Sequence, residues 1–388
     1  MLAAAVGLLA GCSSSTPPGG ASGAGGKAGS GGQQSGGAGG NASGTGGSSG
    51  SGGSAGSGGG TGGSAGTGGT TPDSGAMDTR VDLGGGDGDA AGMGGLVLPI
   101  VRGDSHVLEF GPLVFEVKGA IGARITSLKL EGDELLTGPV ANPRFYGSTL
   151  WTSPADDWVV GMFDPPSIVD RDPYMMTVSA DGAITATNAP FTVKGKRFTV
   201  TKVFRADVAN QAIIIDYKLT NNGTTAPFSL SHWEVTRVFP DGLTFFPTGT
   251  ASKIDFLPQP VQLKTAMGYT WWDNKTHLPM KGESKAGVEA TGGFIAHVAP
   301  KPNGDILFIK SFKDVPAAMA PPGHYEIELF CNDAHSYVEL EDHSAYIPIA
   351  VGQTYTQTVK WYVRRLPAGD HTLGSATLIA AAKGVLGL

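Results

Sequence analysis

The sequence predicts an all-β protein whose antiparallel strands form large sheets stacked as a sandwich. Nearly every segment after residue 105 alternates apolar and polar residues with period two, which is typical of strands that bury one face. Gly, Asn and Asp residues suited to tight turns separate these segments. No convincing helix falls between them, and no fixed-period repeat is evident, which argues against a propeller.

The expected strands begin at residue 106 and end at residue 364. The first segment is interrupted at Gly111-Pro112, and a later hairpin closes at Asp181-Gly182, a pair that tolerates the positive φ of a tight turn. The tail, 375–388, is expected to form a short closing helix with Gly384 as its stop. The expected strand segments are 106–118, 123–131, 174–187, 191–193, 197–205, 211–220, 228–238, 243–247, 292–298, 305–312, 325–331, 336–340 and 355–364.

A segment that cannot form a packed core, 13–95, precedes the strands. It consists almost wholly of Gly, Ser, Ala and Thr, and 37 of the 62 glycines lie before residue 96. Because it buries too little apolar surface to offset the entropy of ordering, we expect a disordered tether with a reach of roughly 50 Å. The folded domain is expected over 96–388, which is ample for one large β domain or two small ones.

The first 12 residues resemble a lipoprotein signal. An apolar run too short to span a bilayer ends in Leu9-Ala10-Gly11-Cys12, which resembles the bacterial lipobox. The resemblance implies that Cys12 receives lipid and becomes the new N-terminus, and that Ser13, in place of Asp, directs the protein to the outer membrane. We therefore expect a cell-envelope lipoprotein, with its domain in the periplasm or at the surface. The alternative is an ordinary secretory signal whose cleavage releases the protein.

Charge and cysteine content exclude several classes. A net charge of −7 without a basic stripe argues against a nucleic-acid partner. A lipid on Cys12 leaves Cys331 without a disulfide partner, and the apolar strand around Cys331 predicts a small buried side chain rather than a nucleophile. No metal or cofactor motif occurs, so neither is expected. The alternative is a cation held by the acidic residues and histidines of 333–343.

The stretch 219–249 organises the candidate site. Asn221-Asn222-Gly223 is typical of a turn that closes a hairpin, and 228–238 alternates as the strand that follows. Side chains of a strand alternate between its faces, so His232, Glu234 and Thr236 fall on one face, and Trp233, Val235 and Arg237 on the other. An imidazole beside a carboxylate can move protons or bind sugar hydroxyls. The alternative is a satisfied polar pair in a half-buried strand.

Three stretches resemble the aldose 1-epimerases and the wider galactose mutarotase-like group, and they lie in the same order. GARITSLKLEGDELL (122–136) resembles the opening hairpin of these proteins, and LTNNGTTAPFSLSHWEVTR (219–237) resembles the central strand that bears a catalytic histidine. SYVELEDHSAYIPIAVGQTYTQTVKWYV (336–363) resembles their closing segment. WTSPADDW and HWEVTR resemble signatures of a bacterial branch of the group. The resemblance implies a β-supersandwich of galactose mutarotase type.

The same resemblance implies a sugar ligand and an acid–base pair. In the group, a carboxylate takes the proton of the anomeric hydroxyl while a histidine gives one to the ring oxygen. His232 takes the acid position, and Glu341 or Glu339 takes the base position, with His343 continuing that strand face. Two features differ from the group: Asp156-Asp157 replaces an Asn-Arg pair, and an earlier histidine has no equivalent in 174–191. Whether the protein catalyses or only binds is therefore left open.

Tryptophans beside polar residues predict where a sugar is held, because sugar C–H faces stack on rings and sugar hydroxyls bind carboxylates and Arg. Trp151 and Trp158 are expected in a solvent-facing loop, and Trp271-Trp272 in a second one that favours ligand or partner contact. The alternative is that each ring closes an open end of the sandwich, and Trp361 is expected in the core. The predicted binding residues are Arg237, Glu234, Trp151, Asp157, Trp158 and Trp272.

The sequence thus predicts a membrane-anchored carbohydrate-binding protein that interconverts sugar anomers or only binds them. One alternative is a glycosidase-like or lyase-associated protein, in which Glu234 or Asp157 faces Glu341 across a cleft. The other is a non-catalytic envelope scaffold that reuses the fold without a sugar site.

Overall fold

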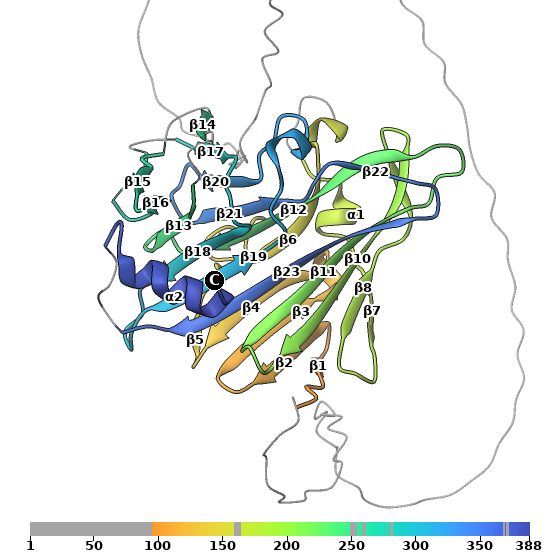
Figure 1. Ribbon diagram of the computed structural model, residues 1–388. Helices are drawn as coiled ribbons and strands as arrows, with labels where there is room; N and C mark the ends of the chain where they lie inside the picture. The colour runs from red at the N-terminus through yellow and green to blue at the C-terminus, as the bar shows by residue number, and fades with distance from the viewer. Residues whose placement is uncertain are drawn as a thin grey trace, which may run out of the picture. The chain divides into compact units, whose positions relative to one another are not determined.

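The computed structural model describes residues 95–158, 164–248, 254–257, 261–276, 278–279, 282–367, 369 and 372–388. The expected lipobox at Cys12 and nearly all of the expected tether lie outside these residues. Within them, two large antiparallel sheets hold most of the regular secondary structure, which confirms the predicted all-β sandwich (Figure 1). Among the described residues, neither helix has the length and apolarity that crossing a bilayer requires.

The larger sheet, which we call the A sheet, has 12 strands. Its central strand is β12, the predicted strand that carries His232. Along the sheet the strands are β1 (Ile100–Arg102), β2 (Ser105–Phe110), β3 (Leu113–Lys118), β4 (Arg124–Leu130), β6 (Ser148–Ser153), β12 (Phe228–Val238), β21 (Val338–His343), β20 (Ile327–Cys331), β17 (Ser284–Val288) and β14 (Ile254–Leu257), with β5 (Asp133–Glu134) beside β4 and β22 (Ile347–Ile349) beside β12.

The second sheet, which we call the B sheet, has 11 strands. Along it the strands are β15 (Lys264–Ala266), β16 (Tyr269–Asp273), β13 (Leu243–Pro247), β18 (Phe294–Ala299), β19 (Ile306–Ser311), β23 (Thr354–Arg365), β11 (Ala212–Asn221), β10 (Lys196–Asp207), β8 (Ile184–Thr187) and β7 (Met175–Val178), with β9 (Phe191–Val193) beside β10. The helices are short: α1 (Ser167–Asp170), α2 (Ala376–Leu386) and the 3-10 turns η1 (Gly119–Ile121), η2 (Ala155–Asp157) and η3 (Ala317–Met319).

The main core lies between the two sheets. Phe115 of β3 packs against Phe204 of β10 and Trp361 of β23, with ring centroids 5.7 and 6.1 Å apart. Cys331 belongs to the same core and is buried, and Trp361 is also buried, as predicted for both residues. The burial of inward-facing residues from both sheets is the hydrophobic contribution that holds the sandwich together.

The turn after β11 is not a hairpin, contrary to expectation. β11 pairs with β10 and β23 in the B sheet, so neither edge of β11 is open to the strand that follows it. The chain instead crosses to the A sheet and continues as β12. Asn221 stabilises this crossing: its side-chain amide donates to the Ile349 carbonyl at 2.8 Å, and its Oδ1 accepts from the Gly223 N–H at 2.8 Å.

The C-terminal helix ends later than predicted. The Ser375 side chain caps the start of α2 by accepting from the Leu378 N–H, and Gly387 ends the helix with a left-handed φ of 73°. Gly384, the predicted stop, lies inside the helix. Leu378 packs on a second core, formed on the far side of the B sheet with Trp271 and its neighbours. α2 therefore covers an apolar sheet face, and Figure 1 shows it beside β18 and β19.

Candidate functional site

The pairing of β12 with β21 divides the candidate residues between two faces of the A sheet. Directly opposite residues share a face. The pairs Trp233–His343, Val235–Glu341 and Arg237–Glu339 lie on one face, and Glu234–Asp342 and Thr236–Leu340 on the other. Leu340 belongs to the core between the sheets. We therefore call the face of Glu234 the inner face and the face of Glu341 the outer face.

His232 lies on the inner face, against the B sheet. Its ring centroid is 4.9 Å from that of Tyr355 on β23, and burial lowers its pKa to about 3. Glu341 and Glu339 project from the opposite face, since their register positions alternate with that of His232. The expectation that His232 and one of these acids meet in one pocket is therefore wrong. The predicted common face of Glu339, Glu341 and His343 is confirmed.

The outer face carries a buried charged group, which we call the outer cluster: Lys285 of β17, Glu328 of β20, Glu341 of β21 and Trp233 of β12. The Nζ atom of Lys285 lies 2.6 Å from Oε2 of Glu328 and 3.1 Å from Oε2 of Glu341. The indole N–H of Trp233 donates to Oε2 of Glu341 at 2.6 Å. The strands β12, β21, β20 and β17 are neighbours in the A sheet. Each therefore contributes one side chain of the outer face to this cluster.

The two glutamates of the outer cluster have different surroundings. Glu328 also accepts from Nδ1 of His324 at 3.0 Å and from the Tyr325 N–H at 3.1 Å. Burial raises its pKa, but Lys285 and His324 outweigh burial and hold the pKa well below its usual value. Oε1 of Glu341 is buried and has no hydrogen-bond partner among the described residues, and burial raises the Glu341 pKa to about 8. At neutral pH Glu328 is thus ionised and can accept a proton, whereas Glu341 is protonated and can donate one.

Two histidines adjoin the outer cluster and raise the question of a metal. The ligand atoms of His324, Glu328 and His343 lie within 4.8 Å of one another. However, Nε2 of His324 accepts from the Ala155 N–H at 3.1 Å, so the ring proton must be on Nδ1, the nitrogen that faces Glu328. A metal ligand needs that nitrogen unprotonated. The arrangement therefore fits a hydrogen-bonded network. Of the predicted cation-binding segment 333–343, His343 is the one residue in the group of His324, Glu328 and His343.

Arg237 lies further along the outer face, where it pairs with Glu339. Its Nε donates to Oε1 of Glu339 at 2.7 Å, and both side chains are buried. Its guanidinium carbon lies 5.2 Å from the ring centroid of Trp151 and 5.3 Å from that of Phe145. A cation held over two rings and bound to a carboxylate is well stabilised. Arg237 thus shares the face of Trp233 and Val235, as predicted, and lies inside a packed aromatic group.

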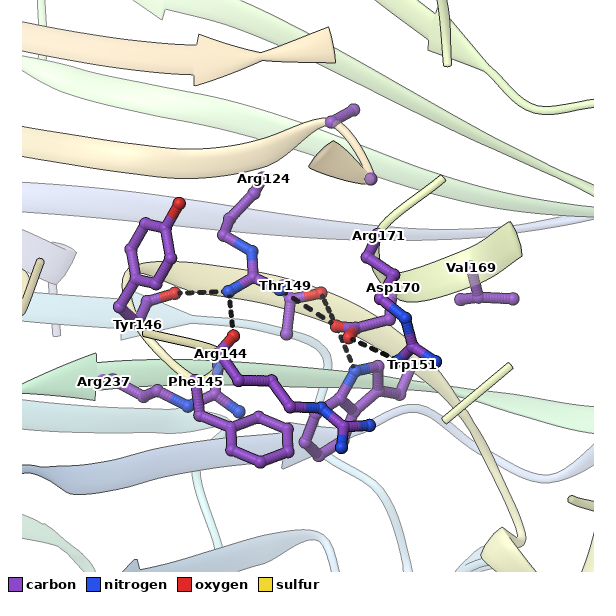
Figure 2. Close-up of polar contacts among 12 residues, drawn as sticks. Arg124, Arg144, Phe145, Tyr146, Thr149, Trp151, Val169, Asp170, Arg171 and Arg237 are labelled. Carbon is purple, nitrogen blue, oxygen red and sulfur yellow. Dashed lines mark hydrogen bonds and ion pairs between the residues drawn. The ribbon is translucent and has the colours of Figure 1, made fainter. Parts of the chain in front are cut away.

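A third polar group on the outer face centres on Asp170, the last residue of α1 (Figure 2). Its Oδ1 accepts from Nε1 of Trp151 at 2.8 Å, from Oγ1 of Thr149 at 3.2 Å and from Arg124 at 3.3 Å. Arg124 also donates to the Arg144 carbonyl at 2.6 Å. These bonds attach α1 and the 144–146 segment to β4 and β6, and they fix the orientation of Trp151.

The predicted sugar-stacking loop at Trp151 and Trp158 is wrong. Residues 148–153 form β6, between β4 and β12, because Thr, Leu and Trp there suit a buried strand. Trp151 is 1% exposed and Trp158 is 4% exposed. Trp158 stacks on Trp233, with ring centroids 5.6 Å apart, so both rings belong to an aromatic core. Asp157, half-buried, forms an ion pair with Lys196.

The second predicted loop, at Trp271-Trp272, is also a strand. Both residues lie on β16 and are fully buried, although adjacent strand residues face opposite ways. Trp272 packs in the core between the sheets, and Trp271 packs in the second core under α2. The expectation of ligand or partner contact for this pair fails because the C-terminal helix covers the far face of the B sheet.

The predicted binding residue Glu234 lies in a second charged group, which we call the inner cluster. Nζ of Lys310, on β19 of the B sheet, lies 2.7 Å from Oδ1 of Asp342 and 3.3 Å from Oε2 of Glu234. The Tyr217 hydroxyl donates to Oε1 of Glu234 at 2.6 Å. Burial, with the neighbouring Glu234, raises the Asp342 pKa to about 7 against the opposing effect of Lys310. Glu234 therefore joins the two sheets.

The segment 313–325, which we call the covering segment, lies against the outer cluster. Its last two residues supply the contacts: the His324 ring lies 4.7 Å from that of Trp233, and His324 and Tyr325 both bond Glu328. The Tyr325 ring occupies the space beside Gly287, where an added Cβ would lie 2.1 Å from its Cδ2. The outer cluster is consequently buried.

Sequence reasoning missed Lys285, Glu328, His324, Lys310 and Asp170. Alternation does assign Lys285 to one face of SKAGV, which forms β17, and Glu328 to one face of IELFC, which forms β20. Nothing local shows that these strands are neighbours, however, because β20 and β17 are brought together by the sheet order.

Comparisons with known proteins found fold similarity only. No family model and no curated protein matches the sequence. Among solved structures, a proposed aldose 1-epimerase of Escherichia coli K12 is 13% identical over 68% of this chain and 99% of its own, with a TM-score of 0.46. A proposed aldose 1-epimerase of Klebsiella pneumoniae is 11% identical over 73% of this chain and 83% of its own, with a TM-score of 0.48. A galactose mutarotase-like protein of Lactobacillus casei is 12% identical over 67% of this chain and 100% of its own, with a TM-score of 0.44. These three carry names of the group that the sequence resembles, and similarity of this degree assigns no activity.

Proposed function

We propose that this protein binds carbohydrate on the outer face of the A sheet. The observation that carries the proposal is the outer cluster, in which Lys285 pairs with Glu328 and Glu341 beside Trp233, on the face turned away from the core between the sheets. Carboxylates, amines and imidazoles are the groups that hold sugar hydroxyls. The lipobox at Cys12 and the Gly-rich tether support a location at the bacterial outer membrane.

Anomer interconversion on this face would use Glu328 and Glu341. Glu328 takes the proton of the anomeric hydroxyl while Glu341 gives a proton to the ring oxygen; the ring C–O bond breaks as the C=O bond forms. Reclosure on the other carbonyl face returns both protons. The two pKa shifts keep Glu328 ionised and Glu341 protonated at neutral pH, which are the states these roles start from. His232 takes no part, since it lies on the inner face.

Burial of the paired carboxylates favours a second function, a non-catalytic envelope scaffold. Lys285 pairs with one oxygen of each carboxylate, and under the covering segment Glu328 and Glu341 are 1% exposed or less. On this alternative, the outer cluster only stabilises the fold.

Ligand titration separates the two functions. NMR titration with D-glucose, D-galactose, D-mannose and D-xylose, followed by a glycan array, measures binding, and exchange spectroscopy of the same sugars measures anomer interconversion. We expect Glu328→Gln to weaken binding by about 10- to 150-fold, the loss of a hydrogen bond to a charged group. Glu341→Gln replaces a protonated carboxyl group and should weaken binding by about 2- to 12-fold, the loss of a neutral hydrogen bond. Glu109→Gln, on the exposed side of β2, is the matched control and should bind normally. A blank panel and array would leave the scaffold function.

Labelling of the expressing cells with a fatty-acid analogue tests the proposed location. Lipid should appear on the wild-type chain and be lost in Cys12→Ala. Equal labelling of both chains, or of neither, rejects the lipid anchor.

A further inference from the structure

The outer cluster contains groups that could bind a sugar, but solvent hardly reaches them. Trp233, Glu328 and Glu341 are each 1% exposed or less, yet a sugar must reach them if they bind it. A sugar can therefore bind only if some segment packed on the cluster moves away without unfolding the sheet.

The covering segment is only weakly attached to the rest of the fold. Most of its residues are exposed, and Val315 and Pro321 are its buried apolar residues before His324. Single hydrogen bonds add to these contacts. The Val315 N–H donates to Oε1 of Glu326 at 2.8 Å, and Oδ1 of Asp314 accepts from a backbone N–H at 2.7 Å. Segments with few buried apolar contacts open locally at low free energy.

The middle of the covering segment makes a backbone contact at the exposed turn η3. There the Tyr346 N–H donates to the carbonyl of Met319 at 2.7 Å, and Met319 is 40% exposed. Gly323 follows, with a φ of 76° and open surroundings that allow the backbone to rotate. Beyond it, the Tyr325 hydroxyl bonds Asp255. Gly323 therefore gives the covering segment a rotatable backbone position next to the two residues that touch the outer cluster.

His324 and Tyr325 occupy the positions that a polar ligand needs. Nδ1–H of His324 and the Tyr325 N–H both donate to Oε1 of Glu328, as two sugar hydroxyls would. Nε2 of His343 lies 3.6 Å from the same oxygen and is buried without a hydrogen-bond partner among the described residues. Departure of His324 would expose an acceptor and a ring nitrogen side by side.

We propose that residues 313–325 are a lid whose His324 and Tyr325 occupy the ligand position. When the lid opens, hydroxyls of a carbohydrate take their place on Glu328 and also bond His343. This inference rests on the proposed function, and it names the part of the site that the sugar occupies. The lid lowers the apparent affinity, because only the open fraction can bind.

Two substitutions open the lid without removing a group that would hold the sugar. Gly287→Ala places a methyl group against the Tyr325 ring, and overpacking of this kind favours the open form by roughly 5- to 150-fold. Tyr325→Phe removes the hydroxyl that bonds Asp255, which favours opening by about fivefold. Gly384→Ala is the matched control, because an added Cβ there meets nothing within 4 Å and lies in α2.

Hydrogen exchange of the full chain measures the opening, and NMR titration with the four aldoses measures affinity. Amides of 313–325 should exchange faster than those of β12 and β21. In Gly287→Ala and Tyr325→Phe they should exchange faster still. The sugar affinity of each variant should rise by the factor expected for its lid opening. Exchange of 313–325 only together with β12 in all three proteins would overturn the lid. Faster exchange with lower affinity would show that His324 and Tyr325 assist binding, which also overturns it. Opening without binding to any sugar in any variant rejects the proposed function, and with it the assigned ligand position.

Discussion

Two buried lysines, each between two carboxylates, lie on opposite faces of the A sheet. Lys310 of the inner cluster comes from the B sheet and reaches Glu234 and Asp342 across the sandwich. Lys285 of the outer cluster comes from the A sheet itself and reaches its neighbours Glu328 and Glu341 along the same face. The chemistry is nearly the same, but the geometry differs: the inner lysine joins two layers and the outer one joins strands of a single layer.

This difference separates a structural role from a binding role. The inner cluster is enclosed by two sheets, and the Leu340 carbonyl and the Tyr217 hydroxyl complete its hydrogen bonds. The outer cluster is completed from above by His324 and Tyr325 of the covering segment. A cluster enclosed by sheets changes only when the protein unfolds, whereas one closed by a loop can exchange its partner.

Lys310→Met tests the structural role and has the largest expected effect. It leaves two carboxyl groups buried without their cation, so the free energy of unfolding should fall by about 3–5 kcal/mol. Urea denaturation followed by tryptophan fluorescence measures the loss. In the control, Glu234→Leu and Asp342→Leu are added to Lys310→Met, and removing all three charges should restore most of the stability. A loss below about 1 kcal/mol for Lys310→Met alone would contradict the structural role.

Lys285→Met should cost less, about 1–3 kcal/mol, in the same measurement. Glu328 keeps its bonds from His324 and Tyr325, and Glu341, which is already protonated at neutral pH, keeps the bond from Trp233. The comparison of the two lysines is itself the test. Equal losses would mean that the outer cluster is as structural as the inner one, which favours the scaffold function.

The strands themselves could be predicted from local sequence. The alternation of 106–118, 123–131 and 228–238 reports which residues of one strand share a face, and the structure confirms each of these strands. Alternation also predicted correctly that Glu339 and Glu341 lie together. These properties depend on neighbours two residues apart, so a short window of sequence contains them.

The candidate site could not be predicted in the same way, because it depends on how distant strands pair. Whether His232 shares a face with Glu341 is decided by the register of β12 against β21, and a shift of one residue would reverse the answer. Trp271 and Trp272 show the same limit, since the core that buries Trp271 is completed by α2. Residues 148–153 were missed for another reason: Ser, Thr and Trp suit both loops and buried strands.

The pH dependence of stability gives the finest comparison of the two faces. The folded-state pKa of Glu341 is raised to about 8, mainly by burial, so the folded protein holds this proton more tightly than the unfolded chain does. The stabilising contribution is present at low pH and is lost as pH rises from the ordinary glutamate range to about 8. His232 and His343, whose pKa values burial lowers to about 3 and about 4, oppose this trend only below the ordinary histidine pKa.

Glu341→Gln should therefore flatten the decline in stability between about pH 6.5 and pH 8 by up to about 1.4 kcal/mol for each pH unit. Asp342→Asn, on the inner face, should flatten it only up to about pH 7, where its raised pKa lies. Urea midpoints at half-unit steps of pH measure both slopes, and Glu109→Gln, an exposed pair with Arg102, is the control. Curves for Glu341→Gln and the wild type that run parallel across this window would show that Glu341 is already ionised in the folded protein. Glu341 would then have no proton to donate to a sugar ring, and this result would favour the scaffold function.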